Sequence, residues 1–344
     1  MKLLTAICGI AAALGISRAC LALDLEPLGR VEVYGEIRAP EDISAIAKVG
    51  SFLLIASDEA AGMDRSENYL QVLKQVGFNR YAVHQDILLV KGAKAEEMDI
   101  EGIAVDGNTV FVVGSHSSLR KRLSPDKNYQ TNRSRFLDSE IDTQKSRNRL
   151  CRLTVDSEGK GSKIEFTNLG DIIRGDPVLR TFSQIPGKEN GVDIEGIAVK
   201  ETWLYVGFRS PVFRGNYVPV MKFQFHTPTD YELLFVNLGG RGIRDITAVS
   251  DGFLIVAGPP GDVDGSYQLY HWDGQDVIPG KDRDSRDIGT VKLLGGIPLP
   301  ANGKAEGVVV LQELPTSYEI VIVYDGVSGG SPQRFRAAKP SRVR

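Results

Sequence analysis

The heptapeptide DIEGIAV occurs twice in this chain, at residues 99–105 and again at residues 193–199. An identity of this length within 344 residues indicates a repeated structural unit. Each copy is an apolar run, followed by a short polar turn and a second run rich in β-branched and aromatic residues. The turn after the first copy, Asp106-Gly107-Asn108, is typical of a hairpin. Each copy is therefore predicted to form a β-hairpin.

Three weaker copies begin at residues 41, 244 and 304. In our alignment the position of the motif Asp is held by Asp42, Asp99, Asp193, Asp245 and Lys304. The position of the motif Glu is held by Ser44, Glu101, Glu195, Thr247 and Glu306. Successive copies are about 50 to 60 residues apart, except for one interval of 94 residues. The long interval contains a polar stretch rich in Arg and Lys, residues 118–148, which we interpret as an insertion between strands.

Two more β-rich runs follow each hairpin except the last, after which only residues 332–338 form such a run. The missing strand is available at the front, in residues 29–37. Four strands per unit, with the N-terminal strand closing the last blade, predict an all-β fold, a five-bladed β-propeller. A sixth blade in the long interval and a pair of β-sandwiches are the alternatives. Helical patterns are weak, and residues 177–185 form at most a short insert.

The first 22 residues have the features of a signal peptide. Lys2 precedes an apolar run, residues 3–16, that is too short to span a bilayer, and small residues lead up to Ala22. An N-terminal membrane anchor is the alternative. Cleavage after Ala22 would leave one propeller domain, residues 23–344, in the periplasm or secreted. Cys151 would be its one remaining cysteine, so no intramolecular disulfide is expected.

The charge balance argues against two classes of partner. The formal net charge is −3, which gives no electrostatic reason to expect nucleic acid or an anionic membrane. We expect a monomer that has no membrane contact after signal cleavage and binds either a small anionic molecule or a protein.

The hairpin geometry predicts where the polar residues meet. The first strand of each blade lines the central channel, and its start lies on the same face as the end of the second strand. The candidate residues at this channel mouth are His116 and Arg209 for catalysis, Asp58, Ser115, Arg244 and Asp325 for ligand binding, and Asp99, Glu101, Asp193, Glu195 and Glu306 for a metal.

Two interpretations of the motif remain open. In the structural one, Asp accepts hydrogen bonds from the backbone of its own turn or of the next blade, and Gly lets the inner strands crowd together. The recurring Glu needs a further explanation, because clustered carboxylates repel one another unless a positive charge compensates them. That charge is either Arg209 and Arg244, in a closed ion-pair network, or Ca²⁺, which takes several oxygen ligands.

Several segments together resemble a known family. The segments GSHSSLRKR, NGVDIEGIAV, GFRSPVFRG and IVAGPPGDVDGSYQLYHW, in this order, resemble a bacterial family catalogued as domain of unknown function 3616. The resemblance implies that the mouth loops with Ser115, His116 and Arg209 belong to the family pattern, and it implies no activity. Ser210 stands where the family usually has Gly. The DIEGIA motif is also similar to one in the phytase-like esterase family, which is propeller-shaped.

Two functions are compatible with these residues. The first is a metal-assisted hydrolase of an ester, phosphoester or lactone, in which Glu101, Glu195, Glu306 and Asp58 hold Ca²⁺. His116 would then move a proton, and Arg209 would stabilise an anion. The second is a non-catalytic binding module. Propellers host both functions, and a hydrolase needs His116 within reach of the metal or of a nucleophilic water.

Overall fold

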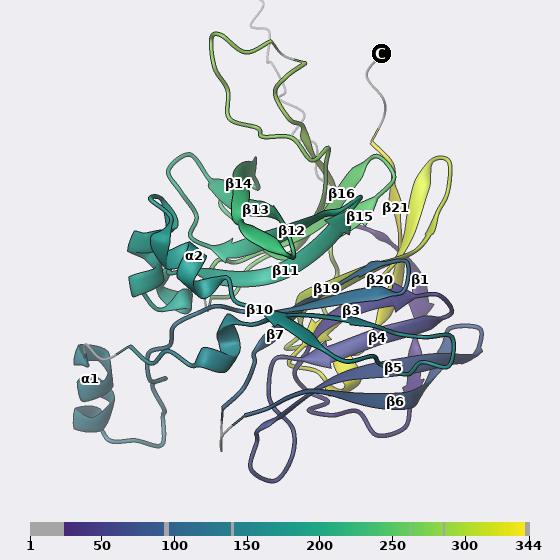
Figure 1. Cartoon of the computed structure of the whole chain (residues 1–344), viewed down its shortest axis with the longest axis horizontal. Coiled ribbons are helices and arrows are strands. Elements are labelled where there is room, and N and C mark those ends of the chain that lie inside the picture. Colours follow the sequence, from purple (N-terminus) through teal and green to yellow (C-terminus); the bar gives the residue numbers. More distant parts are fainter. Residues whose placement is uncertain (1–23, 93–95, 139–140, 262, 285, 341–344) are drawn as a thin grey trace, which may run out of the picture.

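Five β-sheets are arranged in a ring around a central axis, as the blades of a β-propeller (Figure 1). This computed structural model describes residues 24–340, except residues 93–95, 139–140, 262 and 285. The innermost strands are β3 (Ile43–Val49), β7 (Ile100–Asp106), β11 (Asp193–Lys200), β15 (Gly242–Val249) and β19 (Lys304–Glu313). Each contacts the next, and β19 contacts β3, so that the ring closes. The prediction of five blades is confirmed, and the six-bladed and β-sandwich alternatives are wrong.

Each blade continues outwards from its innermost strand. The first blade adds β4 (Phe52–Ser57), β5 (Glu67–Gly77) and β6 (Arg80–Lys91), and the second adds β8 (Thr109–Gly114), β9 (Leu150–Thr154) and β10 (Glu165–Thr167). The third adds β12 (Trp203–Ser210), β13 (Tyr217–Gln224) and β14 (Thr227–Asn237), and the fourth adds β16 (Gly252–Gly258), β17 (Gln268–Trp272) and β18 (Val291–Gly296). The fifth adds β20 (Ser317–Asp325), β21 (Gln333–Ala338) and β1 (Glu26–Arg30).

The N-terminal strand completes the last blade, as predicted. β1 pairs antiparallel with β21, with Glu26 opposite Arg336. The predicted bounds, residues 29–37, are wrong, because β1 begins earlier and a second short strand, β2 (Glu32–Tyr34), leaves that blade. β2 pairs in parallel with β6 of the first blade. The N-terminal segment therefore covers an edge of the last blade and an edge of the first, which would otherwise be exposed.

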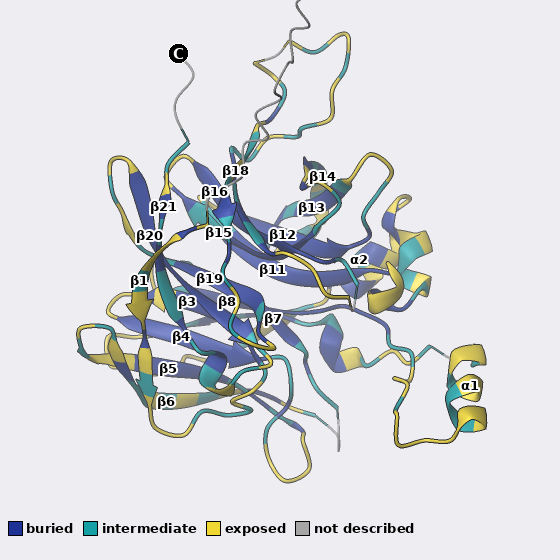
Figure 2. Cartoon of the chain, turned by 180° about the vertical axis from the view of Figure 1, so that it is seen from behind, coloured by how far each residue is buried: buried dark blue, intermediate teal, exposed yellow. Residues whose placement is uncertain are grey.

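The apolar core consists of layers between neighbouring blades, and Figure 2 shows the buried inner strands and the more exposed outer ones. Leu54, Val72, Val112 and Cys151 belong to the layer between the first and second blades. Burial raises the pKa of the Cys151 thiol to about 12. Cys151 is therefore a core residue with an inert thiol, because the thiolate is the reactive form.

The insertion, residues 118–148, contains a helix that the sequence pattern did not predict. Helix α1 (Tyr129–Leu137) begins after Asn128, whose side chain accepts a hydrogen bond from the backbone N–H of Thr131. Such a cap satisfies a free N–H group of the first turn, so a helix can begin here although it has no apolar face. None of the described residues of α1 is buried, and it lies apart from the sheets (Figures 1 and 2). The insertion ends in the 3₁₀ turn η1 (Lys145–Asn148).

Further short helices lie between strands. Between β10 and β11 lie α2 (Gly170–Gly175), η2 (Leu179–Gln184) and η3 (Gly187–Glu189), and η4 (Ser328–Gly330) precedes β21. η2 is the short insert expected at residues 177–185. The predicted signal peptide, residues 1–22, lies outside the described residues. Within the described part of the chain, no helix has the length and apolar character needed to cross a membrane.

Candidate functional site

Every innermost strand has a β-bulge near its first residues, at the channel mouth. Near the start of each of the five strands one residue is skipped in the pairing with the second strand. The skipped residues are Ser44, Glu101, Glu195, Arg244 and Glu306. A bulge redirects a side chain and increases the local twist. Carboxylate oxygens of Glu101, Glu195 and Glu306 consequently lie within 4.8 Å of one another.

The fourth repeat is offset from our sequence alignment. The sequence alignment placed Asp245 at the motif Asp and Thr247 at the motif Glu. In the structure, Arg244 occupies the bulge position that the motif Glu has in other blades. The position of the motif Asp is held by Gly242, which pairs with Gly258 as Asp193 pairs with Ser210 in the third blade. That alignment is wrong because it matched the letter Asp. Asp245 stands where other repeats have the motif glycine, and a methyl group on Gly196 would lie 2.8 Å from the Asp245 Cα.

The motif glycines let the inner strands approach closely. A Cβ on Gly102 would lie 2.8 Å from the backbone nitrogen of Ile197 in the next blade. Where Asp245 replaces the glycine, its carboxylate accepts hydrogen bonds from the N–H groups of Ile246 at 2.8 Å and of Val308, in the next blade, at 2.7 Å. The structural role foreseen for the motif aspartate thus belongs to Asp245.

Two arginines neutralise some of the carboxylates at the channel mouth. Arg209, from β12, places Nη1 2.7 Å from Glu195 Oε1 and also pairs with Asp193. Arg244 places Nε 3.2 Å from Glu195 Oε2 and pairs with Glu306. All of these side chains are buried. The ion-pair interpretation therefore holds for Glu195, Glu306 and Asp193.

Two carboxylates in one cavity of the channel mouth remain uncompensated. A cavity of about 130 Å³, the acidic cavity, is lined by nine acidic and five basic residues. Arg147 pairs with Glu97 and Asp99, and Lys304 lies 3.0 Å from Asp325. Asp58 and Glu101, which also line this cavity, have no ion-pair partner among the residues that the structure describes.

Burial and mutual repulsion raise the pKa values of these carboxyl groups. Burial, followed by the charges of Glu195 and Asp99, raises the pKa of Glu101 well above its usual range. Burial and the charge of Asp99 do the same to Asp58. Burial also raises the pKa of Asp193 to about 6 and that of Glu306 to about 8, although each contacts an arginine. At neutral pH the cavity therefore favours bound protons or a bound cation.

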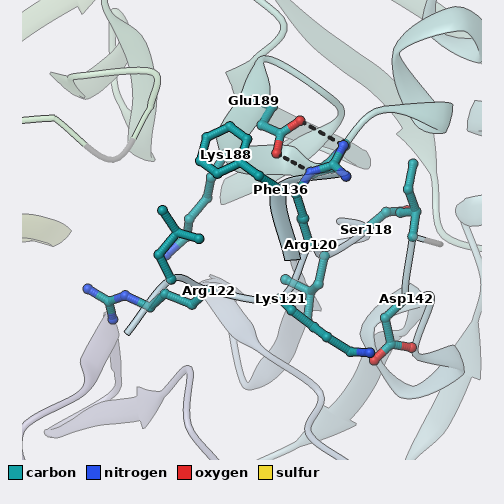
Figure 3. A pocket seen from close by; sticks show the side chains of 12 residues that line it. Ser118, Arg120, Lys121, Arg122, Phe136, Asp142, Lys188 and Glu189 are labelled. Atoms are coloured by element: carbon teal, nitrogen blue, oxygen red, sulfur yellow. Dashed lines mark hydrogen bonds and ion pairs between the residues drawn. The ribbon is translucent and has the colours of Figure 1, made fainter. Parts of the chain in front are cut away.

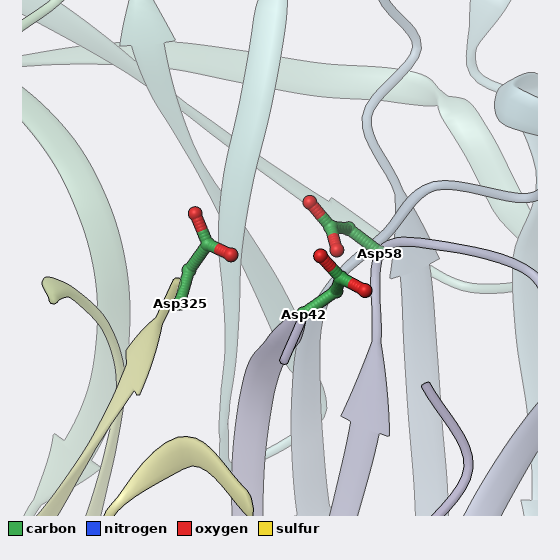
Figure 4. A group of neighbouring side chains, drawn as sticks. All are labelled: Asp42, Asp58 and Asp325. Atoms are coloured by element: carbon green, nitrogen blue, oxygen red, sulfur yellow. The ribbon is translucent and has the colours of Figure 1, made fainter. Parts of the chain in front are cut away.

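Three overlapping groups of carboxylates have the spacing of metal ligands. Glu101, Glu195 and Glu306 form the innermost group, and Asp58, Asp99 and Glu101 form the second. The third consists of Asp42, Asp58 and Asp325, which face one another from three strand ends (Figure 4). Asp58 and Glu101 each belong to two groups. Within the described part of the chain neither of them has an arginine or lysine partner, and the same is true of Asp42.

His116 lies away from this cavity. Its backbone has a φ of 53°, and its Nδ1 is 2.7 Å from the carbonyl oxygen of Gly114, in its own turn. Its buried Nε2 has no hydrogen-bond partner among the described residues, and burial lowers its pKa to about 4. His116 is not among the residues that line the acidic cavity. Its catalytic role remains a prediction.

Ser115 does not line the acidic cavity, but it contacts two residues that do. It is fully buried, with Oγ 2.9 Å from Ser117 Oγ and 3.4 Å from Arg147 Nη1. The acidic cavity brings together the other predicted site residues, which are Asp58, Asp99, Glu101, Asp193, Glu195, Arg209, Arg244, Glu306 and Asp325. Arg147 and Lys188 also line this cavity and were not predicted from the sequence. Arg147 resembles the other basic residues of the insertion, and Lys188 lies outside the repeats.

A second cavity, the basic cavity, adjoins the acidic one. It has a volume of about 370 Å³ and is lined by Lys188, Arg209, Arg244 and Lys304, which also line the acidic cavity. Asp264 is the one acidic residue among its described wall residues. The buried Nε of Arg209 has no hydrogen-bond partner within the described part of the chain, whereas that of Arg244 faces Glu195 Oε2. The Arg209 Nε is a donor suited to an anion.

The sequence profile of the DUF3616 family, proteins of unknown function, matches residues 42–343. The chain belongs to this family. The resemblance stated from the sequence is thereby confirmed for DUF3616. No curated protein matches the sequence.

Solved structures similar to this DUF3616 protein are distant. An exo-β-1,3-galactanase from Phanerochaete chrysosporium is 9% identical, with a TM-score of 0.44 over 92% of this chain and 64% of that chain. A hypothetical protein from Leishmania major is 11% identical, with a TM-score of 0.42 over 91% and 90% of the two chains. The Malassezia sympodialis allergen Mala s 1 is 10% identical, with a TM-score of 0.42 over 91% and 96%. This chain thus spans less than two thirds of the galactanase, and similarities at this level carry no functional argument.

Proposed function

We propose that this DUF3616 protein is a calcium-assisted hydrolase of an anionic ester, phosphoester or lactone. One observation carries the proposal: an acidic cavity with two uncompensated carboxylates shares Arg209 and Arg244 with a basic cavity. A cation and an anionic substrate can therefore lie side by side at the channel mouth. The similarity of the DIEGIA motif to the phytase-like esterase family makes phosphoesters the first substrates to test.

The ligands that best fit Ca²⁺ are Asp58, Asp99 and Glu101. Their carboxylate oxygens lie within 4.8 Å of one another, and Ca²⁺ accepts several such oxygens in a flexible geometry. Asp99 is shared with Arg147, but Asp58 and Glu101 have no ion-pair partner among the described residues. Glu195 and Glu306 fit the cation less well, because Arg244 contacts both of them. We assign these two glutamates to holding the arginines in place.

The protein's own residues would divide the work as follows. Arg209 and Arg244 bind the anionic group and stabilise the negative charge that develops during hydrolysis. Asp58 and Glu101, whose pKa values are raised in the metal-free cavity, would release their protons when they bind Ca²⁺. When bound, Ca²⁺ supplies Lewis-acid activation of the substrate and of water.

The second candidate function is a binding module for a small anionic ligand or a protein. The position of His116 favours it, because the one histidine predicted to move protons does not line the acidic cavity. The basic cavity would then bind its ligand without chemistry.

Metal analysis combined with a substrate panel tests both candidates. We expect the purified protein to contain about one calcium per chain, and to hydrolyse aryl phosphates or aryl esters in a reaction that EGTA stops and calcium restores. The variant Arg209→Gln should slow this reaction, whereas Arg152→Gln, at a surface ion pair, should not. Phosphate binding by calorimetry without turnover of any substrate would favour the binding module. If the protein neither binds phosphate nor turns over any substrate, both functions are contradicted.

We also propose that the protein is exported and monomeric. The sequence of residues 1–22 supports export. N-terminal sequencing of the exported protein should begin at or near Leu23. Recovery of an intact Met1 in the soluble fraction would contradict export.

A further inference from the structure

A large cavity lies under the insertion, beside the channel mouth. This insertion groove has a volume of about 1180 Å³ and runs between the first part of the insertion, the end of α1 and η3 (Figure 3). It exceeds the usual size of a small-molecule pocket. Its apolar wall residues are Leu119, Leu123, Phe136, Ile141 and Pro186.

The insertion groove continues into the proposed site. Ser118, Leu119 and Lys188 line both the insertion groove and the acidic cavity. Lys188 also lines the basic cavity. A molecule whose charged end binds at the channel mouth could therefore place its other end in the insertion groove.

The charges of the insertion groove favour an anion. Arg120 is held by Glu189 at 2.6 Å, and Lys121 is 3.7 Å from Asp138 (Figure 3 shows the Arg120–Glu189 contact). Arg122, Lys188 and the acidic Asp142 have no ion-pair partner among the residues that the structure describes, so the wall keeps a net positive charge. Residues 118–148 include eight Lys or Arg and four Asp or Glu, although the whole chain has a net charge of −3. The insertion is therefore a local positive surface on an acidic protein.

Apolar side chains accompany these charges. Phe136 lines the insertion groove and is 66% exposed, and Leu123, another wall residue, is also exposed. An anion without an apolar part, such as free phosphate, would leave these side chains in water. A ligand with an alkyl or aryl group would cover them and gain the free energy of apolar burial.

We propose that the insertion groove binds the apolar part of an amphiphilic anion, such as a monoalkyl phosphate or another ester with a long alkyl or aryl group. The charged head then lies next to Lys188 at the channel mouth. This inference rests on the proposed function and names the class of its substrate.

Direct binding of dodecyl phosphate below its micelle concentration tests the proposal. Calorimetry in EGTA is suitable, because the insertion groove includes none of the proposed calcium ligands. We expect dodecyl phosphate to bind at least tenfold more tightly than inorganic phosphate and than neutral dodecyl maltoside. Equal affinity for dodecyl phosphate and inorganic phosphate would overturn the apolar part of the proposal. Equal affinity for dodecyl phosphate and the maltoside would overturn its anionic part.

A matched pair of variants locates the binding. Phe136→Ser should weaken dodecyl phosphate binding at least fivefold and leave inorganic phosphate binding unchanged. Tyr129→Ser is the control, because Tyr129 is on the same helix and is 67% exposed but does not line the insertion groove. If both variants weaken binding equally, the exposed surface of α1 is an adsorption surface, as for a membrane or a protein partner, and the proposal is overturned. No effect of Phe136→Ser overturns it as well.

The outcomes separate this inference from the proposed function. Phe136-dependent binding of dodecyl phosphate, together with an absence of calcium and of hydrolysis, would support the insertion groove and contradict the hydrolase. Calcium-dependent hydrolysis of short-chain esters, unaffected by Phe136→Ser and no faster with long-chain esters, would support the hydrolase and contradict the insertion groove.

Discussion

Arg244 and Glu195 occupy the same bulge position in neighbouring blades, and Arg244 Nε lies 3.2 Å from Glu195 Oε2. One repeat thus contributes a cation to a ring in which three others contribute carboxylates. Glu195 also contacts Arg209 at 2.7 Å, so it links the two arginines. This link divides the ring into a compensated side, at Glu195 and Glu306, and an uncompensated side, at Glu101 and Asp58.

The variant Glu195→Gln should destabilise the protein whether or not calcium is present. It removes the charge that both buried arginines face, and breaking such a buried pair costs about 3–5 kcal/mol. Urea unfolding in calcium and in EGTA measures the loss. A loss confined to the calcium-loaded protein would show that Glu195 is a metal ligand and contradict its structural assignment.

The variant Glu101→Gln is the matched comparison and should behave differently. Glu101 faces carboxylates and no arginine partner, so neutralising it relieves repulsion and leaves the metal-free stability unchanged or higher. Stabilisation by calcium, about 2.7 kcal/mol at a hundredfold excess over Kd, should disappear. Thermal unfolding with and without calcium gives the readout. Undiminished calcium stabilisation would place the cation elsewhere.

The metal-free protein should lose stability as the pH rises above about 6.5. The pKa values of Glu306, about 8, and of Glu101 and Asp58 are raised by burial, so the folded state holds protons that the unfolded chain has already released. Stability is then greatest below the unfolded pKa values and falls through the folded ones, by up to about 1.4 kcal/mol per pH unit for each group. His116, with a pKa lowered to about 4, has the opposite effect, but only below its ordinary value of 6.5.

Calcium should reverse this loss at alkaline pH, because it binds the ionised carboxylates. Urea unfolding between pH 6.5 and 9, in EGTA and in calcium, follows both effects. A metal-free stability that is constant or rises over this range would show that the carboxyl groups are already ionised at pH 6.5.

Deleting residues 24–30 should cost most of the stability. The deletion removes β1 and buried Leu25, and it exposes the edge of β21. The control Glu26→Gln affects only a surface ion pair with Arg336 and should cost about 1 kcal/mol or less. Differential scanning calorimetry compares the two variants. A truncated protein that melts within a few degrees of the parent would contradict closure by β1.

Much of the architecture followed from local sequence patterns. Strand and turn signals need only neighbouring residues, so the five repeats and the N-terminal closing strand were predictable from residue order. The motif also indicated a cluster of Glu101, Glu195 and Glu306, because residues at equivalent positions of a ring face the same axis. The bounds of β1 were not predictable, since residues 24–34 pair with two blades that are distant in sequence.

Only the tertiary structure decided the chemistry of the mouth. The bulge that places Arg244 in the ring is defined by pairing with β16, and its contact with Glu306 joins residues 62 positions apart. The fourth repeat carries Asp245 in the glycine position, so a comparison of residue types alone aligns Asp245 with the motif Asp instead. His116 follows a strand like the other mouth residues, yet a backbone in the left-handed region directs its ring to the carbonyl of Gly114. Repeats therefore determine which positions meet, whereas backbone register and long-range ion pairs determine which of their charges stay uncompensated.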